Sequence, residues 1–185
     1  SSQPTQSNFE HALAIDFLRK THNTSNKKML FVEDEGKCIG SVGLPLNLSD
    51  TMRRAPLAII DMPLEFRAQR VLQEYVIDML NDFSQVNAEA GFENLSQYLN
   101  DSLFRIRKRL GLERYQHTAQ LLAHALQTQK STNNSQEHIA WITVLLTEYY
   151  DPMYAYQLQK NQTPIIFRGN YSEVLEWAHQ LTTAK

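Results

Sequence analysis

The chain has 185 residues, a formal net charge of −2 and a pI near 6.3. This length suits one ordinary domain, or a compact core with a helical annex. The charge excludes a protein that is basic overall, although one face can still bind phosphate. A single cysteine, Cys38, excludes an intramolecular disulfide framework and suits a reducing cytosol, so we expect a cytoplasmic protein. No apolar run approaches about 18 residues, so we expect no membrane-spanning helix.

The first third of the chain predicts a helix and two short strands. Apolar residues at helical spacing predict a helix over about residues 8–20. MLFV (29–32) is typical of a buried strand, and it is followed by the acids Glu33, Asp34 and Glu35. Glycines and prolines make residues 36–56 mostly loop. APLAIID (55–61) is a second apolar strand that ends in an acid.

The rest of the chain is mostly helical by pattern. One apolar stripe predicts a long helix that begins at Leu64 and extends past residue 80. Helices follow over about 93–110 and 114–129, joined at Gly111, a natural C-cap residue. A helix over about 137–150 should break or kink at Pro152. TPIIFRGN (163–170) is a third strand, and a last helix over 172–181 has Ser172 as its predicted N-cap.

Apolar strands separated by helices indicate an α/β fold with a parallel sheet flanked by helices. The chain leaves this sheet for about 80 residues of helix and then returns to it. Three strands make a small sheet, so we expect the sheet to be partial. Its open edge is a place where two copies of the chain can pair as a homodimer.

The acids that follow the first strand resemble the carboxylates that hold Mg²⁺ beside a phosphate. A strand ending in Glu33 and Asp34 is a Walker-B-like pattern. Such acids more often form a solvated turn. The glycine-rich phosphate loop that should accompany them, G-x-x-x-x-G-K-[ST], is absent from the sequence. A complete nucleotide site is therefore not expected in this chain.

Two arginines follow the second strand, at the position where P-loop kinases carry residues that reach over phosphates. Arg67 and Arg70 are candidate phosphate ligands, with a solvated helix face as an equal alternative.

A basic helix face and a tyrosine-rich segment are candidate RNA-binding surfaces. Arg105, Lys108 and Arg109 share one arc of a helix, opposite its apolar residues. EYYDPMYAYQ contains Tyr150 and Tyr154, whose rings can stack on unpaired bases. The alternatives are a solvated face for the basic residues and half-buried packing for the tyrosines. The histidines show no metal-ligand spacing, and no base adjacent to Cys38 is identifiable.

Several segments together resemble the bacterial tRNA 2-selenouridine synthases. The resemblance lies in QPTQSNFE (3–10), FVEDEGKCIG with GLPL (31–46), M-x-x-APL (52–57), the D-x-P-L-E-x-R run with R-x-L-x-E-Y (61–75), LLTEYYDPMYAYQL (145–158) and FRGN with EVLEW (167–177). It covers most of the chain, and residues 85–135 carry the least of it.

The resemblance implies a C-terminal fragment of a two-part enzyme. The parent replaces the sulfur of wobble 2-thiouridine in tRNA with selenium from selenophosphate, through a geranylated intermediate made with geranyl diphosphate. Its upstream part would hold a rhodanese domain with a reactive cysteine and the Walker A loop, so the fragment alone is expected to be inactive, with no catalytic residue and no cofactor of its own. Cys38 does not match the setting of that cysteine.

The same resemblance implies roles and boundaries for this chain. Residues 1–84 would be the second half of a P-loop-like domain, 85–161 a helical region, and 162–185 a return to the α/β core. Arg67 and Arg70 would stabilise the phosphate or diphosphate, Glu33 and Asp34 would lie near any Mg²⁺, and the basic and tyrosine surfaces would contact the tRNA anticodon region. A P-loop kinase-like domain acting on a small molecule and a helical protein-interaction module are the alternatives.

Overall fold

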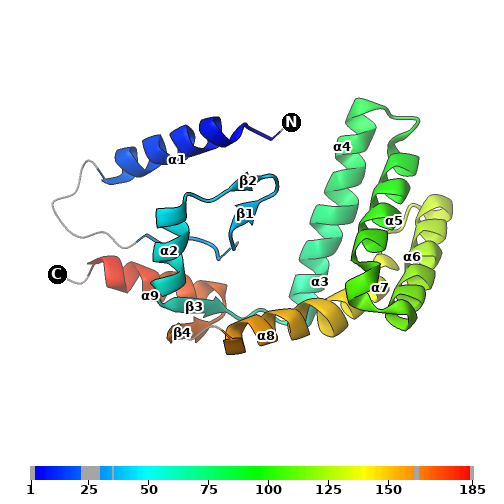
Figure 1. Cartoon of the computed structure of the whole chain (residues 1–185). Coiled ribbons are helices and arrows are strands. Elements are labelled where there is room, and N and C mark those ends of the chain that lie inside the picture. Colours follow the sequence, from blue (N-terminus) through cyan, green and yellow to red (C-terminus); the bar gives the residue numbers. More distant parts are fainter. Residues whose placement is uncertain (1–2, 22–29, 35, 161–162, 184–185) are drawn as a thin grey trace. The chain divides into compact units, whose positions relative to one another are not determined.

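The computed structural model describes residues 3–21, 30–34, 36–160 and 163–183, and the chain divides into two compact units (Figure 1). One is an α/β unit, formed by residues 1–61 and 163–185. The other is a helical unit, formed by residues 62–162. Residues 62–84, which we expected in the first domain, therefore lie in the helical unit.

The helical unit is a continuous succession of helices. These are α3 (Leu64–Leu72), η1 (Gln73–Asp78), α4 (Met79–Val86), α5 (Gly91–Leu110), α6 (Leu112–Thr132), α7 (His138–Leu145), η2 (Leu146–Tyr150) and α8 (Asp151–Lys160). Gly111 joins α5 to α6 at φ 87°, a conformation that L side chains rarely adopt, so the predicted cap is confirmed. Asn133 ends α6 in the left-handed conformation.

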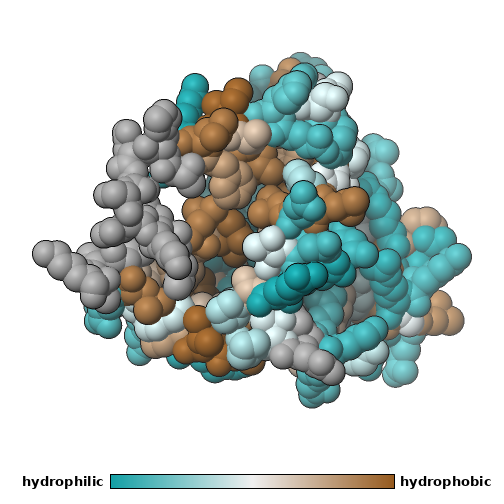
Figure 2. All heavy atoms as spheres, turned by 60° about the vertical axis from the view of Figure 1, so that its left-hand side comes forward, coloured by the Kyte–Doolittle hydropathy of each residue, from teal (hydrophilic) through white to brown (hydrophobic). Residues whose placement is uncertain are grey.

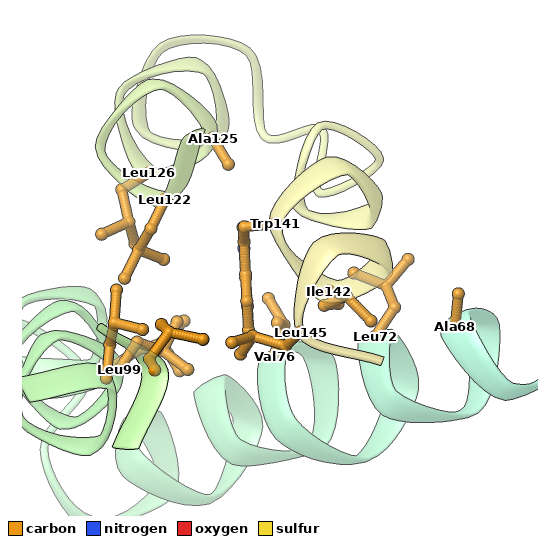
Figure 3. Close-up of a cluster of buried hydrophobic side chains, with 13 residues drawn as sticks. Ala68, Leu72, Val76, Leu99, Leu122, Ala125, Leu126, Trp141, Ile142 and Leu145 are labelled. Carbon is orange, nitrogen blue, oxygen red and sulfur yellow. The ribbon is translucent and has the colours of Figure 1, made fainter. Parts of the chain in front are cut away.

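One hydrophobic cluster fills the helical unit. Its buried side chains come from α3, η1, α5, α6 and α7, and Figure 3 draws them converging from these helices. The predicted apolar stripe, which starts at Leu72 in the helix that begins at Leu64, supplies Leu72 and Val76, and Ala68 one turn earlier joins them; each is at most 2% exposed. Burial of these aliphatic side chains is the main contribution to the stability of the unit.

Two π-helical turns interrupt the helical path. In η1 the turn lies inside the long predicted helix, between α3 and α4. In η2 the turn directly precedes α8, whose second residue is Pro152. Proline lacks the N–H that an α-helix requires, and the wider turn before it allows the helical path to continue. Pro152 therefore marks a change of helix type rather than the end of the helix.

The α/β unit contains a parallel pair of strands whose connection is the helical unit. Strands β3 (Leu57–Ile60) and β4 (Ile165–Gly169) pair in parallel, and α9 (Tyr171–Thr183) packs against both. Asn170 caps α9, because its side-chain oxygen accepts from the Glu173 N–H at 3.1 Å and the Glu173 carboxylate accepts from the Asn170 N–H at 2.7 Å. The predicted cap, Ser172, lies inside the helix.

The N-terminal part of the α/β unit is joined by side-chain amides. It contains α1 (Gln6–Thr21), the antiparallel hairpin of β1 (Cys38–Ile39) and β2 (Val42–Gly43), and α2 (Leu46–Arg54). Gln3 accepts from the Ser41 N–H and donates to the Ile39 carbonyl oxygen, both at 2.8 Å. Gln6 makes the same double contact with the backbone of Gly43, at 2.9 Å each. Each amide thus pairs with the hairpin as a neighbouring strand would.

Two predictions for this unit are wrong. Residues 30–34 form no strand, and Leu30, Phe31 and Val32 are between 43% and 51% exposed; Met29 lies outside the described residues. The segment is instead anchored through Phe31, whose ring meets Trp177 of α9 edge to face. Residues 36–56, expected to be mostly loop, contain the hairpin and α2, which begins directly after Pro45, a residue favourable to helix starts.

Candidate functional site in the helical unit

A cavity of about 610 Å³ lies within the helical unit. Its walls come from Met62, α3, η1, α5, α6, α7, η2 and α8. This volume lies in the range of small-molecule binding pockets, about 300–1,000 Å³. Both π-helical turns contribute wall residues, Tyr75 from η1 and Tyr150 from η2. Such turns occur frequently at functional sites.

The buried part of the wall is apolar. Every wall residue that is less than 10% exposed is aliphatic or aromatic: Leu99, Leu103, Leu122, Trp141, Ile142 and Leu145. A polar ligand group placed among them would lose its hydration without gaining hydrogen bonds. The interior therefore suits an apolar chain or ring.

The three charged wall residues belong, with Phe66, Tyr75 and Tyr154, to the part of the wall that reaches solvent, which we call the entrance. The side chains of Arg67 and Asp151 are 33% and 39% exposed, and that of Arg70 is 65% exposed. Arg70 of α3 is paired with Glu74, one turn later in η1. Such an exposed pair contributes little to stability, so Arg70 can exchange it for an anionic ligand.

Arg67 connects α3 to the start of α8. Its two terminal nitrogens donate to the two carboxylate oxygens of Asp151, Nη1 to Oδ1 at 2.5 Å and Nη2 to Oδ2 at 2.9 Å. These hydrogen bonds lower the pKa of Asp151 below its ordinary value. A bidentate pair of this kind fixes the orientation of the guanidinium group. The entrance arginine is therefore positioned before any ligand arrives.

Aromatic rings also line the cavity. The rings of Tyr150 and Tyr154 are stacked, with centroids 6.5 Å apart, and Tyr149 meets Tyr150 edge to face at 5.0 Å. Burial raises the pKa of Tyr150, and the neighbouring phenols of Tyr149, Tyr75 and Tyr154 raise it further. Tyr150 thus remains protonated at neutral pH and can donate a hydrogen bond.

A buried polar chain supports one wall of the cavity. Nε1–H of Trp141 donates to Nδ1 of His138 at 2.9 Å, and Nε2 of His138 lies 2.9 Å from Oε1 of Gln129. The indole can only donate, so Nδ1 carries no proton and the proton of the neutral ring is on Nε2, which donates to Gln129. Burial lowers the pKa of His138 to about 4, which keeps the ring neutral.

The basic face belongs to α5, a cavity helix, but its side chains do not line the cavity. Ser102, Leu103 and Ile106 of α5 line the cavity, whereas Arg105, Lys108 and Arg109 on the same helix are exposed. No hydrogen bond or ion pair ties these three side chains to another described residue. They form a positive surface of the kind that contacts phosphates.

The predicted metal ligands are not assembled into a site. Glu33 and Asp34 are exposed in the irregular segment 30–34, and Glu35 lies outside the described residues. Within the described ranges, no group of three His, Cys, Asp or Glu residues is placed to hold a metal ion. Glu33 and Asp34 alone therefore do not fit Mg²⁺. At the end of β3, Asp61 is paired with Arg168 at 2.9 Å, and Cys38 is exposed in the hairpin.

The cavity thus brings together residues that the sequence singled out for two different tasks. Arg67 and Arg70, expected at a diphosphate, and Tyr150 and Tyr154, expected at RNA, line the same cavity. Asp151 was missed, although it lies inside the tyrosine-rich segment. The residues of the polar chain, Gln129, His138 and Trp141, were also missed, because their pairing across α6 and α7 has no signal in the sequence.

Comparison with known proteins identifies relatives along the whole chain. The sequence model of the family described as tRNA 2-selenouridine synthase AAA domain matches residues 1–185. Proteins named tRNA 2-selenouridine synthase from Serratia proteamaculans and Photobacterium profundum are 47% and 43% identical over 177 and 178 residues, 95% and 96% of this chain. A protein of the same name from Pseudomonas aeruginosa strain LESB58 is 45% identical over 179 residues, 96% of this chain.

The chain spans about half the length of these relatives, 47% of the Serratia protein and 48% of the other two. No solved structure matches it. These findings do not favour the kinase-like domain or the interaction module as alternatives. None of the described helices is long and apolar enough to span a membrane.

Proposed function

This chain belongs to the family of the tRNA 2-selenouridine synthase AAA domain, and we propose that it provides the prenyl-diphosphate and tRNA-binding part of such an enzyme. The observation that carries the proposal is the cavity with an apolar interior and an entrance of arginines and tyrosines. The activity belongs to the longer parent protein, and this part is expected to be inactive alone.

In this proposal the ligand of the cavity is geranyl diphosphate. Its apolar chain lies among the buried leucines of α5, α6 and α7, where it is removed from water. Its diphosphate remains at the entrance beside Arg67 and Arg70. The fork of a guanidinium group matches phosphate oxygens geometrically, so these side chains can stabilise the charge that develops on a departing diphosphate.

The nucleophile would be the sulfur of a wobble 2-thiouridine. Tyr150 and Tyr154 offer the entrance an aromatic surface on which an unpaired base can stack. A carbon–sulfur bond forms at the first carbon of the geranyl chain while its bond to the diphosphate oxygen breaks, and diphosphate leaves. In a later step, which we assign to the complete enzyme, selenium from selenophosphate bonds to the base carbon that carries the geranylated sulfur while this sulfur leaves as geranyl thiol, and the phosphorus–selenium bond breaks with release of phosphate.

The α/β unit supports a proposal about the architecture of that enzyme. The parallel pair β3–β4, with α9 packed against it, is compatible with the end of a larger P-loop-type sheet. The phosphate loop would then come from an upstream part of the parent, together with its rhodanese domain. Glu33 and Asp34 could approach Mg²⁺ only with ligands from such a part.

Binding of geranyl diphosphate to the chain tests the proposal. Calorimetry should detect saturable binding, and Arg70→Ala should weaken it about tenfold by removing one charged contact. Arg105→Ala is the matched control, because it removes an exposed arginine from a helix that lines the cavity, at a position that is not part of the cavity wall. Absence of binding, or equal losses in the two variants, would contradict the proposed site.

Binding of tRNA tests the basic face separately. Replacing Arg105, Lys108 and Arg109 by Ala should weaken tRNA binding and flatten its dependence on salt concentration. A control triple variant, with Arg19, Lys20 and Arg53 of the α/β unit replaced by Ala, removes the same charge elsewhere. Equal effects of the two triple variants would show that only net charge matters and would remove this face from the proposal.

A further inference from the structure

We propose that Trp141 determines how long an apolar chain the cavity accepts, and that His138 and Gln129 hold the indole in the position that does so. The inference rests on the proposed function, which places a prenyl chain in the cavity. In this proposal Trp141 touches the ligand and determines specificity. His138 and Gln129 do not touch the ligand and act by holding Trp141 in position.

The first observation is where the indole lies. Trp141 is the largest of the buried wall residues and is 7% exposed. Figure 3 shows its side chain extending from α7 into the space between helices, with Leu122 of α6 and Leu99 of α5 on one side and Val76 and Leu145 on the other. A ligand atom that reached this depth would meet the indole.

The second observation is the distance from the entrance to the indole. Trp141 and the entrance residue Asp151 lie ten residues apart on the continuous path of α7, η2 and α8. At the rise of an α-helix this separation would be about 15 Å along the axis, and the wider turn η2 shortens it. A chain whose diphosphate lies at the entrance arginines must therefore run inward along this path, and the indole limits how far it can extend.

The third observation is that the indole is fixed. An aromatic side chain that merely packs in a core can change rotamer when a longer ligand presses on it. Here a rotation would break the bond from Nε1–H of Trp141 to His138, which is itself bonded to Gln129 on α6. All three residues are at most 7% exposed, so no water is at hand to replace the lost bonds.

The test compares prenyl diphosphates of increasing length on variants of the chain. Dissociation constants of geranyl, farnesyl and geranylgeranyl diphosphate are measured by calorimetry for the wild type, Trp141→Leu, Trp141→Ala and Leu126→Ala. Leu126 is the matched control, because it belongs to the same hydrophobic cluster and is equally buried but does not line the cavity. Trp141→Leu retains apolar bulk in case the alanine variant fails to fold.

We expect the wild type to prefer the geranyl compound. Both Trp141 variants should shift the ratio of affinities toward the longer chains by about tenfold or more, because space for added methylene groups opens inside an apolar pocket. Leu126→Ala should leave the ratio unchanged. An unchanged ratio in Trp141→Leu, or an equal shift in Leu126→Ala, would overturn the inference. If the wild type binds none of the three compounds, the proposed function itself fails.

The positioning role has its own readout. The chain contains two tryptophans, so Trp177→Phe leaves Trp141 as the sole indole. In that background His138→Phe retains an aromatic ring but removes the acceptor for the indole N–H. It should shift the emission of Trp141 and relax the preference for chain length while geranyl diphosphate still binds. An unchanged emission and an unchanged preference would show that His138 does not position the indole.

Discussion

The two units of this chain are stabilised in different ways. The helical unit buries a continuous hydrophobic cluster contributed by five of its elements. The α/β unit buries few apolar side chains among its described residues, Val42 and Val174 being the clearest, and leaves Ile60 and Ile165 of its sheet nearly half exposed. A space-filling view likewise shows apolar side chains on the surface of the protein (Figure 2). A self-contained core holds one unit, whereas backbone pairing and side-chain amides hold much of the other.

This difference bears on the kind of pocket that each unit offers. The α/β unit has a pocket lined by exposed or partly exposed residues of α2 and its C-cap: Asn47, Asp50, Thr51, Arg54 and Ala55. A pocket lowers the stability of a protein, because the side chains around it lose packing contacts. The rest of the core must therefore be large enough to offset this loss. The helical unit has such a core around Trp141 and Leu122. The α/β unit has no comparable core behind its pocket, because Val42 and Val174 are the clearest of the few apolar side chains that its described residues bury.

The largest expected effect comes from truncating the core of the helical unit. Leu95 of α5 is 0% exposed and does not line the cavity, so Leu95→Ala should lower the free energy of unfolding by about 2 to 5 kcal/mol. Ile165→Ala in β4, a change on a residue that is 47% exposed, should cost less than about 1 kcal/mol. Urea unfolding followed by far-UV circular dichroism measures the free energy of unfolding of both variants. Comparable decreases in the two variants would contradict the difference between the units.

Sequence patterns predicted the helical unit better than the α/β unit for the same physical reason. A helix that buries one face repeats its apolar residues at a fixed interval, and the stripe from Leu72 to Phe83 is such a repeat. The cap at Gly111 was also readable, because its positive φ favours glycine. In the α/β unit, an apolar run such as residues 30–32 forms a strand only if a neighbouring strand pairs with it. The run itself carries no information on whether such a strand exists.

The cavity was predictable only in part. Charged and aromatic residues at its entrance, such as Arg67 and Tyr150, stood out because of their types and their neighbours in the sequence. Its interior looked like ordinary core, since a leucine that lines a pocket has the same pattern as one that fills it. The bond between His138 and Trp141 spans one helical turn, and its partner Gln129 is on another helix. No local pattern encodes that contact.

Acid should weaken the helical unit through His138. Its pKa is about 4 in the folded protein and near 6.5 when unfolded, so the unfolded chain binds more protons between these values. Stability is therefore complete above pH 6.5 and falls as the pH is lowered toward 4, by up to about 3 kcal/mol. Urea unfolding across this range, compared with His138→Gln, isolates the contribution. Parallel pH profiles in the two proteins would contradict it.

The Arg67–Asp151 pair should contribute less, because both side chains are about one third exposed. A double-mutant cycle with Arg67→Met and Asp151→Asn should give a coupling of about 1 kcal/mol or less at neutral pH. In the folded protein the pKa of Asp151 lies below its ordinary value of 3.8. The coupling should therefore be present above pH 3.8 and should disappear as the pH falls through the lowered pKa of Asp151. A coupling that persisted in stronger acid would show that the carboxylate is not its source.

The smallest effect is expected at the amide contacts of the α/β unit. Gln3 accepts from the Ser41 N–H through its oxygen and donates to the Ile39 carbonyl oxygen through its nitrogen. Gln3→Glu retains an acceptor for Ser41, whereas Gln3→Ala removes it. Loss of one such bond should reduce the protection of the Ser41 amide about two- to tenfold.

Amide hydrogen exchange measured by NMR distinguishes these two variants. Protection of Ser41 should survive in Gln3→Glu and decrease in Gln3→Ala, while the amides of the helical cluster, such as that of Leu95, remain unchanged. Loss of protection in both variants would mean that the donated bond to Ile39 holds the hairpin in place. A decrease in the protection of the Leu95 amide would show that the two units unfold cooperatively, which would contradict their separate stabilisation.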